Sequence, residues 1–389
     1  MGLARLAVWL GRARIDLMAS RPRILALLSD GYGARGGIAR YNQDLLDVLG
    51  ASGADILVLP RHGDASGLVL PKNVIQMPAV YGRAQYLMAC ILALLRHRPF
   101  DVVFCGHIYM ASMAWAFAKL LKARLWMQAH GTEVAAAAAN GGSTRRTIEA
   151  ADLVTVVSRA TRHELLGWAD LAPERARVLP DTVRDSFVPG PASEELRTRL
   201  RLGPGPILLT VGRLASTERY KGHESIFATL PALRAKFPTL VHVVAGEGDD
   251  RIRLEARAAE LARDPAAVRF VGFVPEENLP DLYRLADLYV MPSTHEGFGI
   301  VYLEAAACGL RVIGGKGGGS ADAVATERIG VLVEPSDTAA LTATIERLLG
   351  EGRVDPAAIA PYRKGEFAHS AQRLLARLMD RPRRKRGEP

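Results

Sequence analysis

Cysteine, long apolar runs and acidic residues at the chain ends are all scarce in this sequence of 389 residues. The three cysteines (Cys90, Cys105 and Cys308) lie in apolar surroundings without metal-ligand spacing, which argues against a disulfide framework and favours a reducing compartment. The best candidate for a membrane span, residues 86–95, is too short to cross a bilayer. With 49% hydrophobic and 23% charged residues, the composition is that of a globular protein, and the length suits two domains.

The shortage of acidic residues at the two ends makes the net charge of +9 uneven. Residues 1–25 hold five arginines and one aspartate, and residues 381–389 hold five basic residues and one glutamate. The body of the chain is nearly neutral, which argues against a nucleic-acid-binding domain because such a domain needs basic residues on its folded face. The basic tail 381–389 is either a solvated segment or a contact to anionic lipid. In the second case each basic residue near the membrane surface contributes about 1 kcal/mol of binding free energy.

Residues 1–20 interleave apolar side chains with arginine and form a basic amphipathic extension before the first predicted strand. Such a segment is either an interfacial helix or an over-extended start. Arg12 and Arg14 follow the short apolar run where a signal peptide has small residues at a cleavage site, which argues against a secretory signal. We therefore expect a cytoplasmic protein, with an anionic membrane surface on the cytoplasmic face as a candidate partner.

Strand-like apolar runs alternate with helical segments along the chain, which favours an α/β fold with parallel sheets. The region 187–206 is rich in proline, glycine and charge, which is a linker composition. We expect two open α/β domains, residues 21–190 and 200–362, with ligands bound beyond the carboxyl ends of their strands in a cleft. The predicted strands are residues 23–29, 55–60, 101–106, 124–130, 153–158 and 176–180, then 207–212, 240–246, 268–274, 287–293, 311–315 and 331–334.

Two carboxylates, Glu296 and Glu304, have seven residues between them across a predicted strand-to-helix turn. Gly297 and Gly299 precede the helix that begins near Ile300, and a helix N-terminus beside glycines offers free backbone N–H groups to a phosphate. Carboxylates would repel that phosphate unless they point past it and accept hydrogen bonds from hydroxyls. The segment therefore predicts a ligand with phosphates in its middle and polyols at both ends, which is a nucleotide-sugar.

Two cations follow the first strand of the second half. Arg213 and Lys221 flank a polar loop, and Lys221 with Gly222 precedes a helix. Either residue alone is typical of a solvated surface charge. Because both follow a strand end, as Glu296 does, we interpret them as a clamp for a diphosphate, with Arg binding in a forked geometry and Lys as a point charge.

The first half offers weaker signals at two strand ends. Gly36 and Gly37 belong to a glycine-rich turn before a helix, which is either a plain turn or a close backbone approach to a phosphate or an acceptor. His130 follows the fourth predicted strand. It is either a structural histidine or a residue that donates a hydrogen bond or moves a proton in the cleft.

Together these motifs resemble the family 4 retaining glycosyltransferases of the GT-B fold, in which two Rossmann-like α/β/α domains face a cleft. The second half matches in order and spacing over about 170 residues, and the Glu-x₇-Glu segment is its most specific part. The first half matches more loosely, through Gly36-Gly37 and the segment 130–133. The resemblance also implies that a C-terminal helix at about residues 365–380 packs back on the first domain.

The resemblance assigns roles to single residues. Arg213 and Lys221 would hold the donor diphosphate, Glu304 would accept from the ribose hydroxyls, and Glu296 would contact hydroxyls of the transferred sugar. His130 would contact that sugar near its reacting face, so His130, Glu296, Arg213 and Lys221 are the candidate catalytic residues. The other candidate donor-binding residues are Gly36, Gly37, Phe273, Val274, Gly297, Phe298, Gly299, Ile300 and Glu304, with the backbone near Phe273 and Val274 reading the base.

The function implied is transfer of a hexose from a nucleotide-sugar, GDP-mannose or a UDP-hexose, to a glycan or lipid-linked acceptor. We expect no metal and no cofactor beyond the donor substrate, because preorganised cations can stabilise a departing diphosphate and no Asp-x-Asp motif is present. No residue is a convincing covalent nucleophile. The alternatives are a non-catalytic sugar- or nucleotide-binding subunit of a polysaccharide-assembly complex and a nucleotide-sugar epimerase of the same fold.

Overall fold

The computed structural model describes residues 21–380, except residue 98, residues 140–141 and residues 325–327. The predicted extension 1–20 and the basic tail 381–389 lie outside the described residues. The described chain forms two compact units, residues 21–180 with 367–380 and residues 181–366. Within these residues no helix is long and apolar enough to span a bilayer, and no three His, Cys, Asp or Glu side chains are grouped as metal ligands.

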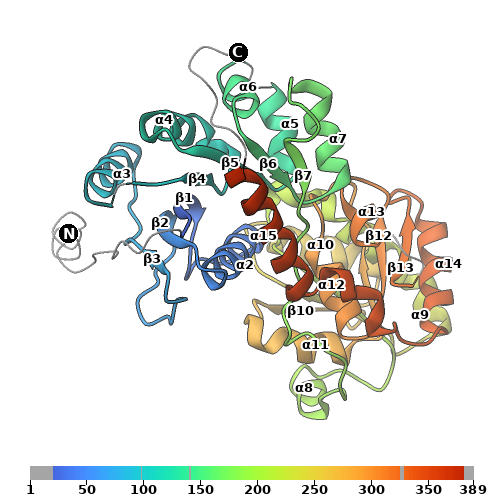
Figure 1. Ribbon diagram of the computed structural model, residues 1–389. Helices are drawn as coiled ribbons and strands as arrows, with labels where there is room; N and C mark the ends of the chain where they lie inside the picture. The colour runs from blue at the N-terminus through green and yellow to red at the C-terminus, as the bar shows by residue number, and fades with distance from the viewer. Residues whose placement is uncertain (1–20, 98, 140–141, 325–327, 381–389) are drawn as a thin grey trace. The chain divides into compact units, whose positions relative to one another are not determined.

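The first unit is built on a seven-stranded parallel sheet in the order β3-β2-β1-β4-β5-β6-β7 (Figure 1). The first strand in sequence, third in this order, is fully buried from Ile24 to Leu28, as expected when helices cover both faces of a parallel sheet. All six strands predicted for this half are present, and the short β3 was missed. The strands are β1 (Arg23–Asp30), β2 (Asp55–His62), β3 (Val74–Gln76), β4 (Val102–Cys105), β5 (Arg124–Ala129), β6 (Leu153–Val156) and β7 (Ala176–Val178).

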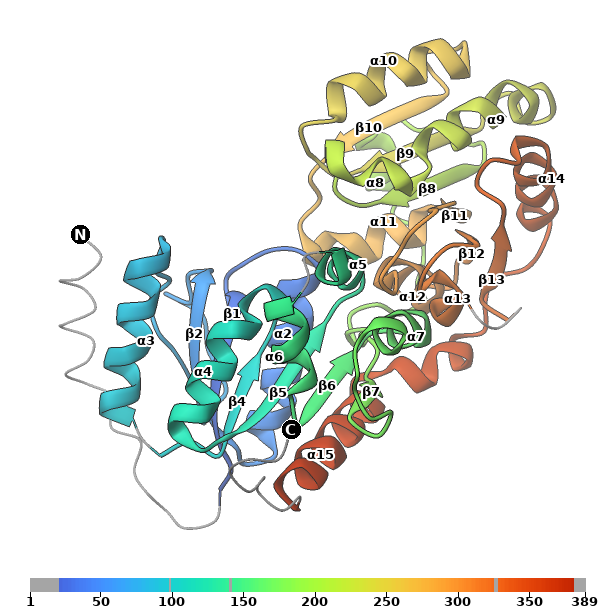
Figure 2. The same cartoon turned by 90° about the horizontal axis from the view of Figure 1, so that it is seen from above.

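Helices lie on both faces of this sheet (Figure 2). The C-terminal helix joins the first unit from Phe367 onward, where the Phe367 ring packs edge-on against Tyr41 at 5.8 Å between centroids. Arg124 Nη2 donates to the Met379 carbonyl at 2.6 Å. The helices are α2 (Gly37–Ala51), α3 (Arg83–His97), η1 (Ile108–Met110), α4 (Ala111–Leu121), α5 (Thr132–Ala139), α6 (Gly142–Glu149), α7 (Arg159–Trp168) and α15 (Lys364–Asp380).

The second unit contains a six-stranded parallel sheet in the order β10-β9-β8-β11-β12-β13. The predicted α/β class with two parallel sheets is therefore confirmed. Its strands are β8 (Ile207–Val211), β9 (Val241–Ala245), β10 (Val268–Gly272), β11 (Leu288–Met291), β12 (Arg311–Gly315) and β13 (Gly330–Val333). Its helices are α8 (Glu194–Arg199), η2 (Ser216–Lys221), α9 (His223–Lys236), α10 (Arg251–Ala262), η3 (Glu276–Asn278), α11 (Leu279–Leu285), α12 (Ile300–Ala307), α13 (Ser320–Ala323), α14 (Thr338–Leu349) and η4 (Pro356–Tyr362).

In both sheets the order in which successive strands are added reverses direction beside the first strand of the sheet. In the second unit β8 pairs with β9 on one side and with β11 on the other, so the connections after β8 and β11 leave the sheet in opposite directions. In the first unit the same relation holds for β1, which lies between β2 and β4. Loops at the carboxyl ends of such neighbouring strands diverge and leave room for a ligand.

Candidate functional site

The strongest predicted residues of the second unit meet beside the carboxyl ends of β8 and β11. We call this place, where the direction of strand order reverses, the switch point of the sheet. Arg213 and Lys221 lie in the connection after β8, and Glu296 lies in the connection after the neighbouring β11. The two connections are joined directly, since the Thr294 backbone N–H donates to the Tyr220 carbonyl at 2.9 Å. Sheet topology therefore brings together residues that are more than 70 positions apart in the sequence.

A third charged residue, Glu218, lies between the two cations. Its carboxylate pairs with Arg213 through Oε1 and with Lys221 Nζ through Oε2, the latter at 2.6 Å. The Glu218 side chain is 10% exposed, the Lys221 side chain 12% and the Arg213 side chain 75%. The predicted cation pair is thus present, and each cation already has an anionic partner. Sequence reasoning missed Glu218, although its position three residues before Lys221 indicates a helical contact.

Local backbone geometry places these side chains. The short helix η2 kinks at Glu218, whose φ of −115° and ψ of 30° are not helical. Gly222 follows with a φ of 76°, and a Cβ there would lie 2.4 Å from the Pro292 carbonyl oxygen. Glycine after Lys221 is therefore required, because a left-handed residue must pass close to the backbone that follows β11.

Glu296 has one carboxylate oxygen, Oε1, that is buried and has no hydrogen-bond partner. Burial raises the pKa of Glu296 to about 7, Lys221 lowers it, Glu218 raises it, and a hydrogen bond with Ser293 lowers it. Buried polar atoms are normally satisfied, so an unpartnered oxygen on a carboxylate beside Lys221 is a candidate contact for a ligand hydroxyl. This geometry supports the predicted sugar contact and gives no sign of a nucleophile aligned by other groups.

The loop that carries Glu296 is held by the glycine cluster after β12. The Gly319 N–H donates to the Glu296 carbonyl at 2.6 Å. A Cβ at Gly317 would lie only 1.8 Å from the Thr294 carbonyl oxygen, so this loop can pack backbone to backbone only without side chains. These backbone contacts show that the glycine cluster supports the Glu296 loop.

Glu304 lies in the interior of the unit. It is only 2% exposed, and its Oε2 accepts a hydrogen bond from the Tyr283 hydroxyl at 3.0 Å. Contact with a ribose therefore requires that one of its oxygens be uncovered, and its role stays a prediction. The two carboxylates of the Glu-x₇-Glu segment thus have different surroundings. Glu296 has one oxygen without a hydrogen-bond partner, whereas Glu304 accepts a hydrogen bond from Tyr283.

The remaining predicted donor contacts of this unit fall into two places. Gly299 caps α12 with a φ of 87° and no side chain, whereas Phe298 is 3% exposed and packs against Tyr362 at 5.9 Å between ring centroids. Phe298 is therefore a packing residue of the turn. Gly297 and Ile300 are half-buried beside it, and Phe273 and Val274 follow the edge strand β10, with Phe273 46% exposed.

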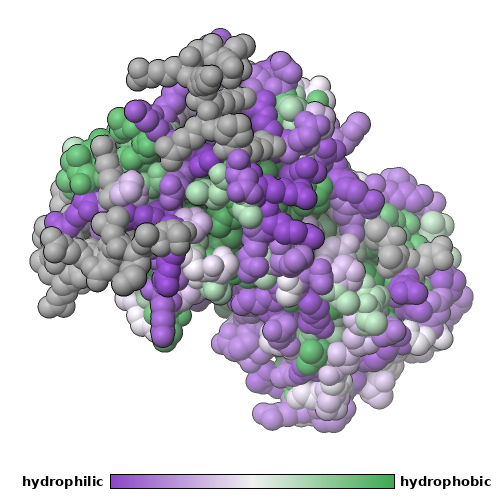
Figure 3. Space-filling view, in the orientation of Figure 1, coloured by the Kyte–Doolittle hydropathy of each residue, from purple (hydrophilic) through white to green (hydrophobic). Residues whose placement is uncertain are grey.

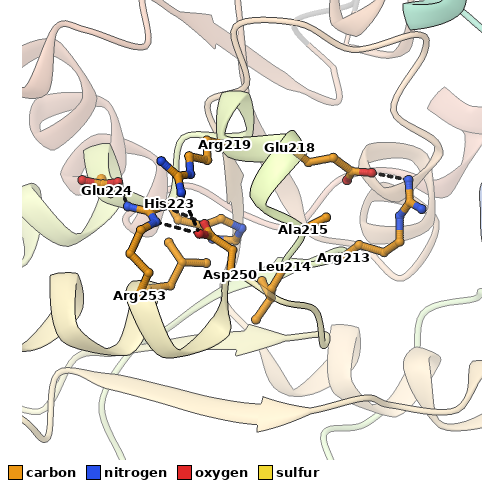
Figure 4. Close-up of a pocket in the computed structure, with 10 residues that line it drawn as sticks. Arg213, Leu214, Ala215, Glu218, Arg219, His223, Glu224, Asp250 and Arg253 are labelled. Carbon is orange, nitrogen blue, oxygen red and sulfur yellow. Dashed lines mark hydrogen bonds and ion pairs between the residues drawn. The ribbon is translucent and has the colours of Figure 1, made fainter.

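A small polar depression is lined by residues of the Arg213 loop, of the start of α9 and of the start of α10 (Figure 4). Its arginines are already paired with acids: Asp250 contacts Arg253 at 2.6 Å and Arg219 at 3.5 Å. Neither ring nitrogen of the buried His223 has a hydrogen-bond partner, and burial lowers its pKa to about 4. The lining residues are Arg213, Leu214, Ala215, Glu218, Arg219, His223, Glu224, Asp250, Arg253 and Leu254.

In the first unit His130 follows β5, and its ring orientation is defined. Its Nε2 lies 2.9 Å from the Gly106 carbonyl oxygen, and its backbone N–H donates to Glu133. A carbonyl only accepts, so Nε2 carries the proton. Burial lowers the pKa of His130, opposed by Glu133, and a neutral ring then presents Nδ1 as an acceptor. His130 is thus arranged to accept from a hydroxyl through Nδ1, since its ring donor is occupied.

Gly36 and Gly37 lie at the N-terminus of α2, next to the switch point of the first sheet. Both are exposed, no side chain caps the helix, and no atom lies within 4 Å of a Cβ built on either one. The space in front of this helix is open, which agrees with the predicted close approach of a ligand without showing one. His107, missed from the sequence, follows β4 with its ring 5.9 Å from that of His130.

Two family models match this chain. Glycosyltransferase Family 4 matches residues 35–187, and Glycosyl transferases group 1 matches residues 193–362. The chain belongs to the family 4 glycosyltransferases. The models cover the two units in order, including every predicted site residue, so the family resemblance inferred from the motifs is confirmed.

Curated relatives and solved structures agree with this assignment. The chain is similar to a GDP-mannose-dependent phosphatidylinositol monomannoside mannosyltransferase of Mycolicibacterium smegmatis, at 33% identity over 54% of this chain and 56% of the relative. A monoacylated phosphatidylinositol monomannoside mannosyltransferase of Corynebacterium glutamicum matches at 26% identity over 86% of this chain and 90% of the relative. The match spans only about half the length of several curated relatives.

Among solved structures, sucrose-phosphate synthase from Thermosynechococcus elongatus superimposes with a TM-score of 0.73 at 22% identity, over 92% of this chain and 99% of that one. Anabaena HepE in complex with UDP and glucose gives a TM-score of 0.72 at 18% identity, over 92% of this chain and 100% of that one. At these identities the likeness shows the fold alone, and it confirms the GT-B class for this chain.

Proposed function

We propose that this protein is a retaining glycosyltransferase that moves a hexose from a nucleoside-diphosphate sugar to a glycan or lipid-linked acceptor in surface polysaccharide or glycolipid synthesis. The observation that carries the proposal is the group formed by Arg213, Lys221 and Glu296 at one sheet switch point, with Glu296 Oε1 buried and without a hydrogen-bond partner. The names of the relatives support a GDP-mannose or UDP-hexose donor. The acceptor class follows from the phosphatidylinositol mannosides on which two relatives act.

Charge placement explains how the second unit would promote transfer. Breaking the sugar–phosphate bond builds negative charge on the departing diphosphate, and Arg213 and Lys221 are positioned to stabilise it without a metal ion. Both cations are paired with Glu218, so the diphosphate must compete with this carboxylate when it binds. Preformed cations at fixed positions need little reorganisation during the reaction, which is the source of their catalytic value.

The remaining polar groups would contact hydroxyls of the sugar. Glu296 Oε1 accepts from, or in its protonated form donates to, a hydroxyl of the sugar, because its pKa of about 7 allows both states near neutral pH. His130 accepts from a second hydroxyl through Nδ1. Neither residue acts as a nucleophile in this proposal; in same-face transfer the leaving phosphate oxygen takes the acceptor proton.

Purified protein tests this directly. Thermal-shift measurements with GDP-mannose, UDP-glucose and UDP-galactose identify the donor, since a ligand that binds the folded state raises the melting temperature. Incubation of that donor with lipid-linked or glycan acceptors is then followed by mass spectrometry. A transferred hexose supports the proposal. An isomerised donor would show an epimerase, and binding without transfer or donor hydrolysis would show a binding subunit.

A further inference from the structure

Helix α3 presents apolar side chains to the outside of the first unit. Leu87, Met88, Ile91 and Leu95 are 44%, 50%, 38% and 68% exposed. Their spacing of one, three and four residues puts them on one face of the helix. Single exposed apolar residues are common on protein surfaces, but a continuous helical face of four is a feature that marks an interaction site.

Packing of the unit does not account for this face. The same helix buries Tyr86, Cys90, Ala93 and Leu94 against the sheet, and the Tyr86 hydroxyl donates to the Leu59 carbonyl at 2.6 Å. These inward residues supply the contacts that hold α3 in place. The outward residues could be polar without loss of the fold, so their hydrophobicity calls for a partner outside the unit.

Charge around the face is of one sign. Neither α3 nor the adjoining α4 contains an Asp or Glu, and α3 carries the exposed Arg83 and Arg96 at its two ends. The two helices lie side by side in Figures 1 and 2, and hydrophobic side chains gather over this part of the molecule in Figure 3. On α4, Lys119 is exposed beside Leu120, which is 60% exposed, and Lys122 follows.

We propose that the face formed by Leu87, Met88, Ile91 and Leu95, together with Arg83 and Arg96, docks on an anionic lipid surface. A helix lying in the membrane plane buries its apolar face among the acyl chains while basic residues stay with the headgroups. Each basic residue near such a surface strengthens membrane binding by about fivefold. A symmetric pair of two copies through this face would bring arginines and lysines together without acidic partners, which disfavours the second copy as occupant.

This inference is independent of the proposed transfer reaction, because vesicle binding is measured without donor or acceptor. It also differs from membrane contact through the basic segments 1–20 and 381–389. Both routes bring positive charge to lipid, but only the α3 face requires apolar side chains of the described fold.

The test uses the full chain and vesicles of phosphatidylcholine with or without about one-third phosphatidylglycerol, a composition that supplies negative surface charge. Sedimentation gives the bound fraction at increasing lipid concentration. The double variant Leu87→Gln/Ile91→Gln is expected to weaken binding to the anionic vesicles by about tenfold or more, because two side chains lose the favourable burial of their apolar surface among the acyl chains. Ile252→Gln is the matched control, since Ile252 is 82% exposed on α10 of the other unit.

Removal of both residues 1–20 and residues 381–389 in parallel separates the two routes. Retained binding after this truncation, with loss in the double variant and none in Ile252→Gln, supports docking through α3. Unchanged binding in the double variant would overturn the proposal. It would equally be overturned if light scattering shows that the wild-type chain self-associates and the double variant does not, since the face would then join two copies. Melting temperatures within about 2 °C of the wild type confirm that the variants fold, as expected for surface changes.

Discussion

The two units share one sheet plan and differ in the chemistry at their switch points. In the second unit the loops after β8 and β11 bring charged groups together: Arg213 and Lys221 share Glu218, and Glu296 Oε1 nearby has no hydrogen-bond partner. In the first unit the switch point lies between β1 and β4, and the loops after β4 and the next strand, β5, present the neutral rings of His107 and His130. The same topology therefore positions loops in both units, while loop residues decide what each can bind.

This difference indicates which unit would stabilise the negative charge of the donor diphosphate. A donor diphosphate needs fixed cations, and at the second switch point Arg213 and Lys221 are candidates for that role. The first unit has a histidine whose Nε2 bonds to the Gly106 carbonyl and an open helix N-terminus at Gly36. Its helix α3 has an outer face of apolar and basic side chains. We infer a division of labour in which the second unit holds the donor and the first faces the sugar, the acceptor and its membrane.

The largest effect is expected from Lys221→Ala. Loss of a preorganised cation at the departing diphosphate should lower kcat/KM by about a thousandfold. Lys236→Ala is the matched control, because Lys236 also pairs with a glutamate, Glu346, on the surface of the same unit. Steady-state transfer rates decide the matter; equal activity of the two variants would remove Lys221 from the site.

A smaller effect is expected in the first unit from His130→Ala. Removal of one hydrogen-bond acceptor for the sugar should lower kcat/KM by about 10- to 100-fold, since a bond made to a substrate hydroxyl is worth a few kcal/mol at most. Binding of the free nucleoside diphosphate, measured by calorimetry, should stay within about twofold of the wild type because its contacts lie in the other unit.

The control for this variant is His163→Ala, which removes an exposed histidine from α7 of the same unit. If His130→Ala instead weakened nucleoside-diphosphate binding as strongly as Lys221→Ala, the division between the units would be wrong. A loss of melting temperature alone, with unchanged kinetics, would make His130 a structural residue.

Glu218→Gln sharpens the account of the second unit. The donor diphosphate competes with this carboxylate for Arg213 and Lys221, so removal of its charge should tighten binding of GDP or UDP by about three- to tenfold. Calorimetry at two salt concentrations measures the change. Glu224→Gln, which removes a carboxylate paired with Arg253 and Arg257, serves as the control. Weaker binding in Glu218→Gln would show that Glu218 orients the cations and does not compete with the ligand.

The smallest effect concerns stability and pH. Burial raises the pKa of Glu296 to about 7, so the folded protein keeps this proton over a range where the unfolded chain has lost it. The contribution of Glu296 to stability is therefore full below about pH 4.5 and is lost as the pH rises through about 7. Glu296→Gln should gain in melting temperature relative to the wild type, by a few degrees, between about pH 5 and pH 8. A constant difference across this range would contradict the raised pKa.

Sequence reasoning predicted most of the fold and three residues that the structure brings together as a candidate donor site. Apolar runs bounded by turn residues predicted twelve of the thirteen strands, and only β3, three residues long, was too short to be recognised. Arg213, Lys221 and Glu296 were recognised because each follows a strand, and parallel strands place their carboxyl ends along one edge. Glu218 was missed since its importance depends on the kink that turns it toward both cations.

The surroundings of individual side chains could not be predicted from the sequence alone. The Glu-x₇-Glu spacing predicts two carboxylates near one ligand, but only the packing of Tyr283 leaves Glu304 engaged while Glu296 Oε1 has no partner. In the same way, the sequence 86–95 is simply apolar, and the structure shows which of its residues face the sheet and which face outward.

Periodicity, turn residues and motif spacing are local properties, and they were enough to specify two parallel α/β units and the family to which the chain belongs. Burial, hydrogen-bond partners and the pKa of a carboxylate depend on neighbours far apart in the chain. The pairing of Glu218 with two cations, the acceptor nitrogen of His130 and the outward apolar face of α3 therefore arise only in the tertiary structure, because each is defined by contacts that folding creates.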